Sequence, residues 1–307
     1  MPETGHRLRR DGPVFRRPSP QPAHGDQEEM TRKTDIERRA VLRTLATASG
    51  AALTSAVLSR QAAAASDAAT TQKAAATNKM KGRATIILAH GAWADGSSWS
   101  AVIRPLQSMG LPVIAAPLPL TSFMDDVTAL NRTIERTEGP VVLAAHAYAG
   151  AVISASASER VKSLVFIAAL APDEGETVGD VFYRLPAHPD TAKLAPDANG
   201  LIWMTEGDFG KAFAQHAAPA ETHLLYATQR PIDVVCIKQP VPKPGWKTRP
   251  SWFLIAEEDR MINPQTQHFM ANRMKAHITS RQVDHVPLVT SPDNVVEIIR
   301  QSVEALG

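Results

Sequence analysis

The stretch Gly139–Val152, GPVVLAAHAYAGAV, decides the fold of this chain. Its first half, Pro140–Ala145, is an unbroken apolar run of strand length, and a helical pattern follows over Ala147–Ser158. Small residues dominate the junction between the two, as a tight turn requires. The stretch therefore predicts a buried strand that enters a helix through a sharp turn.

This layout is that of a nucleophile elbow, in which the motif G-x-S-x-G lifts a serine hydroxyl above the end of a sheet. The corresponding residues here are Ala145, His146, Ala147, Tyr148 and Ala149. Alanine stands at the nucleophile position, and its methyl group can neither attack a substrate nor donate a proton. Alanine also replaces both glycines, and as the smallest residue with a Cβ it should preserve the turn. We expect an elbow without its nucleophile.

Strands and helices alternate on both sides of the elbow. The expected strands are Thr85–Ala89, Pro112–Ala116, Pro140–Ala145, Val161–Leu170, Ser251–Ala256 and Ile278–Val283. The expected helices are Trp99–Met109, Met124–Arg136, Ala147–Ser158, Pro264–Ala276 and Pro292–Leu306. This alternation over residues 83–307 predicts an α/β fold with a doubly wound, mostly parallel sheet.

Residues 173–248 interrupt the alternation. The segment contains eight prolines and only two helical fragments, Thr177–Tyr183 and Gly207–Gln215. Because it is far longer than the loops of compact domains, we interpret it as an inserted helical lid. Its large apolar side chains suggest an apolar pocket of ordinary size; they are Phe182, Tyr183, Trp203, Met204 and Phe209.

The first 64 residues read as an export signal. Arg38-Arg39-Ala40-Val41-Leu42-Arg43 resembles a twin-arginine motif, and the weakly apolar stretch Thr44–Leu58 and the small residues Ala62–Ala65 follow it. The apolar stretch is shorter than the roughly 20 residues of a membrane-spanning helix. Met30 is an alternative start, and residues 65–82 read as a linker. We therefore expect a periplasmic or secreted protein.

The charge of the chain gives no reason to expect a nucleic-acid partner. Residues 1–64 hold 11 basic and 7 acidic side chains, a net charge of +4. The whole chain has +2, so the remainder has a net charge of −2.

The single cysteine, Cys236, excludes an intramolecular disulfide and is expected to be a buried structural thiol. No phosphate loop or metal-ligand spacing is present, so we expect no cofactor. The oligomeric state is not readable from the sequence.

Four groups of candidate site residues follow predicted strands, and ligands of open α/β sheets bind beyond the carboxyl ends of strands. One group is the elbow. The others are His90-Gly91-Ala92-Trp93, Glu257-Glu258-Asp259 and Asp284-His285. Gly91 should let the backbone turn tightly and leave N–H groups facing a site. From the residues alone, any of the four carboxylates could be the partner of His285.

The chain from about Thr85 to Leu306 resembles α/β-hydrolases of the group that contains plant methylesterases, hydroxynitrile lyases and many bacterial hydrolases. The residues that carry the resemblance are HGAW at 90–93, GPVVLAAHAYAGAVI at 139–153, LVFIAALAPDEGE at 164–176, EEDRMI at 257–262 and the loop around His285. The order of elbow, Asp259 and His285 is also the order of an α/β-hydrolase triad.

The resemblance implies a role for each matching position. His285 would be the general base, Asp259 its orienting carboxylate, and Ala147 the place of the absent nucleophile. The backbone N–H groups of Ala92 and Tyr148 would form the oxyanion hole. His146 is expected to pack behind the elbow. The expected substrate-binding side chains are Trp93, Phe182, Tyr183 and Trp203.

Three functions fit these residues. The first is an esterase-like hydrolase for a small apolar substrate, with weak, water-mediated or lost activity. The second is a cofactor-free lyase or oxygenase that transfers a proton with His285 and Asp259. The third is an exported pseudoenzyme that only binds a ligand. Ser154 and Ser156 lie about 10–13 Å along the helix from Ala147, so neither hydroxyl can simply replace the missing one.

Overall fold

The computed structural model describes residues 84–306. The expected signal region over residues 1–64, the alternative start at Met30 and the linker over residues 65–82 lie outside the described residues. Between residues 84 and 306, no helix is both long and apolar enough to span a bilayer.

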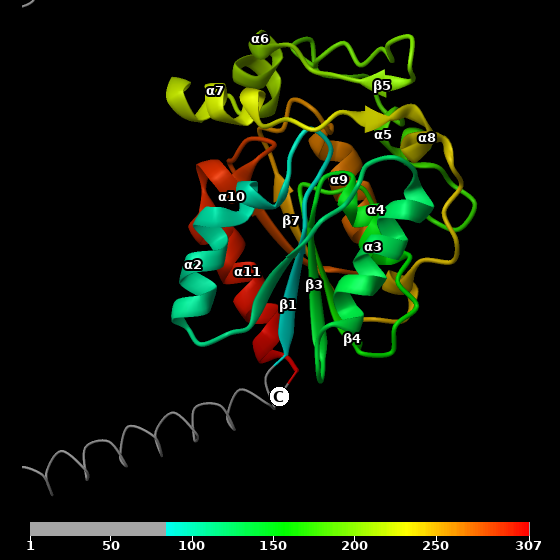
Figure 1. The fold of residues 1–307 in the computed structure, drawn as a ribbon, viewed down its shortest axis with the longest axis vertical. Helices are drawn as coiled ribbons and strands as arrows, with labels where there is room; N and C mark the ends of the chain where they lie inside the picture. The colour runs from blue at the N-terminus through cyan, green and yellow to red at the C-terminus, as the bar shows by residue number, and fades with distance from the viewer. Residues whose placement is uncertain (1–83, 307) are drawn as a thin grey trace, which may run out of the picture. The chain divides into compact units, whose positions relative to one another are not determined.

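A six-stranded sheet forms the centre of the described chain (Figure 1). Its strands are β1 (Thr85–Ala89), β2 (Val113–Ala116), β3 (Val141–His146), β4 (Val161–Ile167), β7 (Ser251–Ala256) and β8 (His277–Arg281). The order is β2-β1-β3-β4-β7-β8, and every neighbouring pair is parallel. Strands β1, β3 and β7 are buried along their whole length, which explains their continuous apolar runs. This confirms the predicted doubly wound sheet.

Helices cover both faces of the sheet (Figure 1). On one face lie α2 (Ser100–Ser108), α10 (Pro287–Thr290) and α11 (Pro292–Glu304), with the 3-10 turn η1 (Gly96–Trp99) before α2. On the other lie α3 (Phe123–Glu135), α4 (Ala149–Ser154) and α9 (Pro264–Arg273). The Ser122 side chain caps α3 by accepting a hydrogen bond from the Asp125 N–H at 3.0 Å. Apolar residues at helical spacing then bury one face of α3.

The helix after the elbow is shorter than predicted. We expected it over Ala147–Ser158, and it spans Ala149–Ser154. It begins late because Ala147 has a left-handed backbone, with φ of +49°. It ends early where Ser156 supplies competing hydrogen bonds: its hydroxyl donates to Asn131 Oδ1 at 2.9 Å and accepts from the Ser158 N–H at 3.5 Å.

Strand β4 also ends before the predicted Leu170. Its last residue is Ile167, because Ala168 adopts φ of +43° and leaves the extended conformation. The last strand, β8, is displaced by one or two residues from the predicted Ile278–Val283. Neither change alters which loops leave the carboxyl ends of the sheet.

The segment between β4 and β7 crosses the carboxyl ends of the strands (Figure 1). Its elements are α5 (Val178–Phe182), β5 (Leu201–Ile202), α6 (Glu206–Asp208), the π-helical turn η2 (Phe209–Phe213), α7 (Pro219–Ala227), β6 (Ile232–Asp233), α8 (Val234–Lys238) and η3 (Gly245–Lys247). Strands β5 and β6 pair antiparallel. Sequence patterns anticipated α5 and the region of α6 and η2 but missed α7, α8 and both strands, because such short elements carry almost no periodicity. We call residues 173–248 the inserted segment.

Candidate active site

The sheet brings the loops after β1 and β3 side by side. Strand β1 lies between β2 and β3, so the order of strands reverses there and leaves a crevice at the carboxyl ends. The loop His90–Trp93 follows β1, and the elbow follows β3. The loops after β7 and β8 supply Asp259 and His285 to the same edge. The fold therefore positions all four predicted groups together.

The elbow keeps its strained geometry without a serine. Ala147 has φ of +49°, a left-handed conformation that costs a residue with a Cβ about 1 kcal/mol or more. The surrounding chain holds it there. Its carbonyl oxygen accepts hydrogen bonds from the N–H groups of Gly150 at 3.1 Å and Leu170 at 2.9 Å, and its own N–H donates to the Ile167 oxygen at 3.3 Å.

Two glycines are required by close contacts at the elbow. A Cβ on Gly91 would lie 3.0 Å from both the Ala147 Cβ and the His146 Nδ1. A Cβ on Gly150 would lie only 2.5 Å from the Leu170 carbonyl oxygen. Gly91 therefore serves close packing; its own backbone is not left-handed, and the chain turns at the next two residues, Ala92 and Trp93. The left-handed residue of that loop is Trp93, with φ of +56°.

His285 and Asp259 form a buried pair. The His285 Nδ1–H donates to the Asp259 Oδ2 at 2.8 Å, and the exposed fractions of the two side chains are 2% and 0%. The Asp259 Oδ1 accepts the N–H groups of Met261 at 2.7 Å and Ile262 at 2.8 Å, and the Gln267 Nε2 donates to the Oδ2 at 2.8 Å. Because the carboxylate is satisfied on both oxygens, the imidazole orientation is fixed and Nε2 is its basic nitrogen.

The other three candidate carboxylates have different partners. Glu257 binds the His268 Nε2 at 2.8 Å, and Glu258 binds the His216 Nε2 at 2.9 Å. Asp284 precedes His285 in the chain but accepts the Thr290 hydroxyl at 2.5 Å and the His216 N–H at 3.0 Å. The geometry thus selects Asp259.

His146 packs behind the elbow and holds the loop of His285. Its Nε2–H donates to the His285 carbonyl oxygen at 2.7 Å, and the two rings lie 4.8 Å apart. Burial holds the pKa of His146 well below its usual value, so the ring is neutral. Its Nδ1 has no hydrogen-bond partner among residues 84–306. Sequence reasoning found the position of His146 but not this contact.

Two backbone N–H groups at the site have no acceptor in the described part of the chain. They belong to Ala92, after β1, and Tyr148, after Ala147. The next N–H along the first loop, that of Trp93, donates to the Arg230 oxygen at 3.1 Å. Ala92 and Tyr148 both line the cavity described next, so their free N–H groups are available to a bound oxygen atom.

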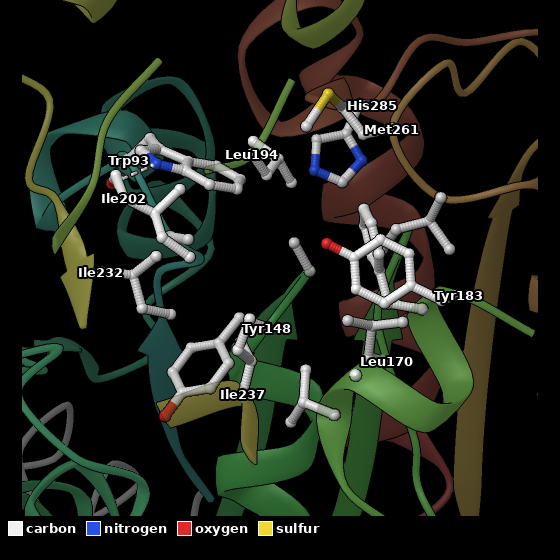
Figure 2. Close-up of a pocket in the computed structure, with 16 residues that line it drawn as sticks. Trp93, Tyr148, Leu170, Tyr183, Leu194, Ile202, Ile232, Ile237, Met261 and His285 are labelled. Atoms are coloured by element: carbon white, nitrogen blue, oxygen red, sulfur yellow. Dashed lines mark hydrogen bonds between the residues drawn. The ribbon is translucent and has the colours of Figure 1, made fainter. Parts of the chain in front are cut away.

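An apolar cavity lies at the elbow, with Ala147 in its lining. Figure 2 shows the cavity with ten of its lining residues labelled. Apolar side chains make up almost all of its lining, as in most small-molecule sites. The lining residues are Ala92, Trp93, Ala147, Tyr148, Leu170, Val178, Gly179, Phe182, Tyr183, Leu194, Ile202, Ile232, Ile237, Met261, Ile262 and His285. Half of them come from the inserted segment, which therefore shapes the cavity.

Trp203 is the one predicted substrate-binding residue that does not line the cavity. Its side chain is 48% exposed, whereas its neighbours Ile202 and Met204 are buried. Side chains alternate along an extended chain, so the residue between two inward-facing side chains points outward. Phe209, like Met204, belongs to the buried core and not to the cavity lining.

Comparison with known proteins agrees with this fold. The sequence profile described as "Alpha/beta hydrolase family" matches residues 86–298. The chain belongs to this family. A protein named "Probable hydrolase R7" from a Phoma species is 20% identical over 251 residues, which cover 70% of this chain and 96% of that protein.

Solved structures share the α/β-hydrolase fold. Polyneuridine aldehyde esterase matches with a TM-score of 0.63 at 16% identity, over 72% of this chain and 99% of its own. A pyrethroid hydrolase from Sphingobium faniae matches with a TM-score of 0.61 at 20% identity, over 72% of this chain and 98% of its own. At such identities the likeness shows the fold alone.

A buried carboxylate stands behind the elbow of this α/β hydrolase. The Tyr148 hydroxyl donates to the Asp126 Oδ2 at 2.7 Å, and the Leu120 N–H donates to the Oδ1 at 2.7 Å. Burial raises the pKa of Asp126 to about 6 and that of Tyr148 well above its usual value. The thiol of Cys236, buried as expected, lies 3.9 Å from the same carboxylate, and its pKa is raised to about 12.

Sequence reasoning missed Asp126, although a signal was present. On α3 it lies three residues after Phe123 and four before Leu130, which places it on the apolar face of the helix. A carboxylate on such a face needs buried partners.

Residues 84–306 contain no cluster of three side chains suited to a metal ion.

Proposed function

We propose that this α/β hydrolase cleaves small, largely apolar esters by direct attack of water, without a covalent intermediate. The observation that carries the proposal is the arrangement around Ala147. A buried His285–Asp259 pair leaves the Nε2 free, and two residues of the same cavity lining, Ala92 and Tyr148, have backbone N–H groups without acceptors in residues 84–306. The position between them holds only a methyl group.

In the proposed reaction His285 acts as a general base. Its Nε2 removes a proton from water while the water oxygen bonds to the ester carbonyl carbon. The N–H groups of Ala92 and Tyr148 stabilise the negative charge on the carbonyl oxygen, and Asp259 stabilises the imidazolium. The tetrahedral intermediate then collapses, the C–O bond to the leaving group breaks, and the alkoxide takes the proton back from Nε2. The products are a carboxylic acid and an alcohol.

The strained elbow supports this proposal. A chain that no longer used the oxyanion site could relax Ala147 out of the left-handed region and gain about 1 kcal/mol. The strained turn instead leaves the Tyr148 N–H without an acceptor in residues 84–306.

The test measures hydrolysis of p-nitrophenyl acetate by the wild type and by His285→Ala and Ala147→Ser. We expect slow turnover by the wild type and loss of turnover in His285→Ala. Ala147→Ser should raise the rate at least about a hundredfold and produce a burst, since a triad serine contributes several orders of magnitude. Ala155→Ser, at the far end of α4, is the matched control and should change nothing. Brisk wild-type turnover that is insensitive to His285→Ala would contradict the proposal.

The free His285 Nε2 also supports a second candidate function. An apolar cavity with one free imidazole Nε2 also suits removal of a proton from a C–H or O–H acid, as a cofactor-free lyase or oxygenase requires. That function does not need a serine, so Ala147→Ser would leave its rate unchanged while His285→Ala abolishes it. A protein that only binds ligands would keep its affinity in His285→Ala and show no turnover.

We further propose that the chain is exported by the twin-arginine route, on the evidence of its first 64 residues alone. Replacing Arg38 and Arg39 together by lysine should retain a reporter fused after residue 82 inside the cell. Unchanged export of that variant would refute the route.

A further inference from the structure

Four side chains lining the cavity carry nitrogen or oxygen atoms, and most of these atoms are already engaged. The Trp93 Nε1–H donates to the Ile202 oxygen at 2.9 Å, and the Tyr148 hydroxyl donates to Asp126 at 2.7 Å. The His285 Nδ1–H donates to Asp259. Within residues 84–306, the His285 Nε2 and the Tyr183 hydroxyl are the two lining side-chain groups left without a hydrogen-bond partner.

The two lining tyrosines point in opposite directions (Figure 2). The phenol oxygen of Tyr148 faces away from the centre of the cavity, and that of Tyr183 faces towards it, on the same side as the His285 ring. Tyr183 comes from the inserted segment and His285 from the loop after β8, so the inserted segment adds a hydroxyl to the cavity that His285 also lines.

Local contacts hold Tyr183 in this position. Its N–H donates to the Gly179 oxygen at 2.9 Å, which makes it the cap of α5. At the other end of α5, Thr177 and Asp180 form a capping box. The Tyr183 ring packs edge-to-face on Phe182 at 4.8 Å. Tyr183 is 59% exposed, so solvent reaches the residue.

We infer that Tyr183 is a catalytic residue that holds the attacking water in the space left by the missing serine. This inference rests on the proposed hydrolysis. One hydrogen of the water donates to the His285 Nε2 and the other to the Tyr183 oxygen, which leaves an oxygen lone pair directed at the substrate carbonyl. The phenol keeps its own proton and donates it to solvent. Only the proton transferred to Nε2 moves during the step.

The physical gain is the orientation of a molecule that would otherwise rotate freely. An oxygen at the serine position of a triad is held by covalent bonds, whereas a water needs two fixed hydrogen-bond partners to reach the same geometry. His285 supplies one partner, and the lining offers one hydroxyl that is not already bonded within residues 84–306, that of Tyr183. A hydroxyl that reaches only the substrate would contribute to binding and not to this step.

The experiment uses all three tyrosines of the chain and the serine variant. Tyr183→Phe should lower kcat for p-nitrophenyl acetate at least about tenfold with little change in KM, and should leave the shape of the pH–rate profile unchanged because His285 is still the base. Tyr226→Phe is the matched control, since Tyr226 packs on Phe209 outside the cavity, and it should retain the full rate. Tyr148→Phe removes the hydrogen bond to the buried Asp126 and should lower the thermal unfolding temperature.

A second experiment distinguishes whether the Tyr183 hydroxyl binds the attacking water or the substrate. In Ala147→Ser the first burst of p-nitrophenol comes from attack by the serine hydroxyl and uses no water. Tyr183→Phe added to Ala147→Ser should therefore leave the burst rate within about twofold while slowing the steady state. An equal loss in the burst and in wild-type turnover would overturn the inference in favour of substrate binding.

The two proposals fail in different ways. Wild-type turnover with an unchanged rate in Tyr183→Phe refutes the role of Tyr183 alone. Absence of wild-type turnover above the buffer rate refutes direct attack by water, and with it the role of Tyr183 in holding that water. Because the Tyr183 hydroxyl has no partner in the described chain, its removal should leave the thermal unfolding temperature unchanged, which circular dichroism checks.

Discussion

Replacing Asp126 by asparagine removes a buried charge from behind the elbow. Burial is the largest cause that raises the pKa of this carboxyl from 3.8 to about 6, and the neighbouring Asp125 adds to the rise. Hydrogen bonds from Tyr148 and Leu120 and the positive charge of Arg230 act in the opposite direction but do not cancel it. Asparagine keeps the shape of the side chain and can still accept from one donor and donate to the Tyr148 oxygen.

Proton linkage fixes the direction in which the free energy of unfolding changes with pH. Between about pH 4 and pH 6 the folded protein holds the Asp126 proton more tightly than the unfolded chain does, so the free energy of unfolding falls as the pH rises. Because its pKa is raised from 3.8 to about 6, ionised Asp126 lowers the free energy of unfolding by about 3 kcal/mol at neutral pH, relative to the fully protonated protein. About 2 kcal/mol of that decrease occurs between pH 4.5 and pH 7.5.

The assay is urea denaturation of the wild type and Asp126→Asn at about pH 4.5, 6 and 7.5. The difference in unfolding free energy should shift by about 2 kcal/mol in favour of Asp126→Asn across this range, whatever constant offset the substitution introduces. Asp125→Asn is the matched control. Hydrogen bonds from Ser122 and Thr121 lower the pKa of the exposed Asp125, so its contribution to stability is lost as the pH falls. A difference for Asp126→Asn that stays constant with pH would refute the reasoning.

Three further predictions concern the elbow and the histidine pair. Gly150→Ala places a Cβ 2.5 Å from a backbone oxygen and should cost about 1–3 kcal/mol in urea denaturation, whereas Gly207→Ala, in a roomy site, should cost almost nothing; equal values would contradict the packing argument. A fluorophosphonate probe should leave the wild type unlabelled and label Ala147→Ser stoichiometrically by mass spectrometry; a labelled serine in the wild type would mean that the site is wrongly assigned. Asp259→Asn should lower the rate of p-nitrophenyl acetate hydrolysis about 10²-fold or more, because the imidazole of His285 loses its fixed orientation; a rate within twofold of the wild type would separate the pair from the reaction.

Sequence patterns predicted the strands and the elbow of this site well, because each depends on residues that are close together in the chain. The continuous apolar runs of β1, β3 and β7 and the small residues of the elbow act over a few neighbouring positions. Outward placement of Trp203 was missed because β5 has only two residues, too few for an alternating pattern. Asp126 and its bond to Tyr148 were missed because the two residues lie on different elements, 22 positions apart.

The sequence by itself determined the α/β fold, because strands and helices alternate along residues 83–307. It also determined the presence of an elbow and the absence of a serine hydroxyl at position 147, because both are properties of one short stretch of chain. The tertiary structure alone decided which carboxylate reaches His285, that His146 holds the His285 carbonyl oxygen, and that Tyr183 turns its hydroxyl into the cavity while Tyr148 turns away. The hydrogen bonds among them join residues 22 to 139 positions apart in the chain. Their geometry depends on how strands and helices pack, and no local pattern of residue types records it.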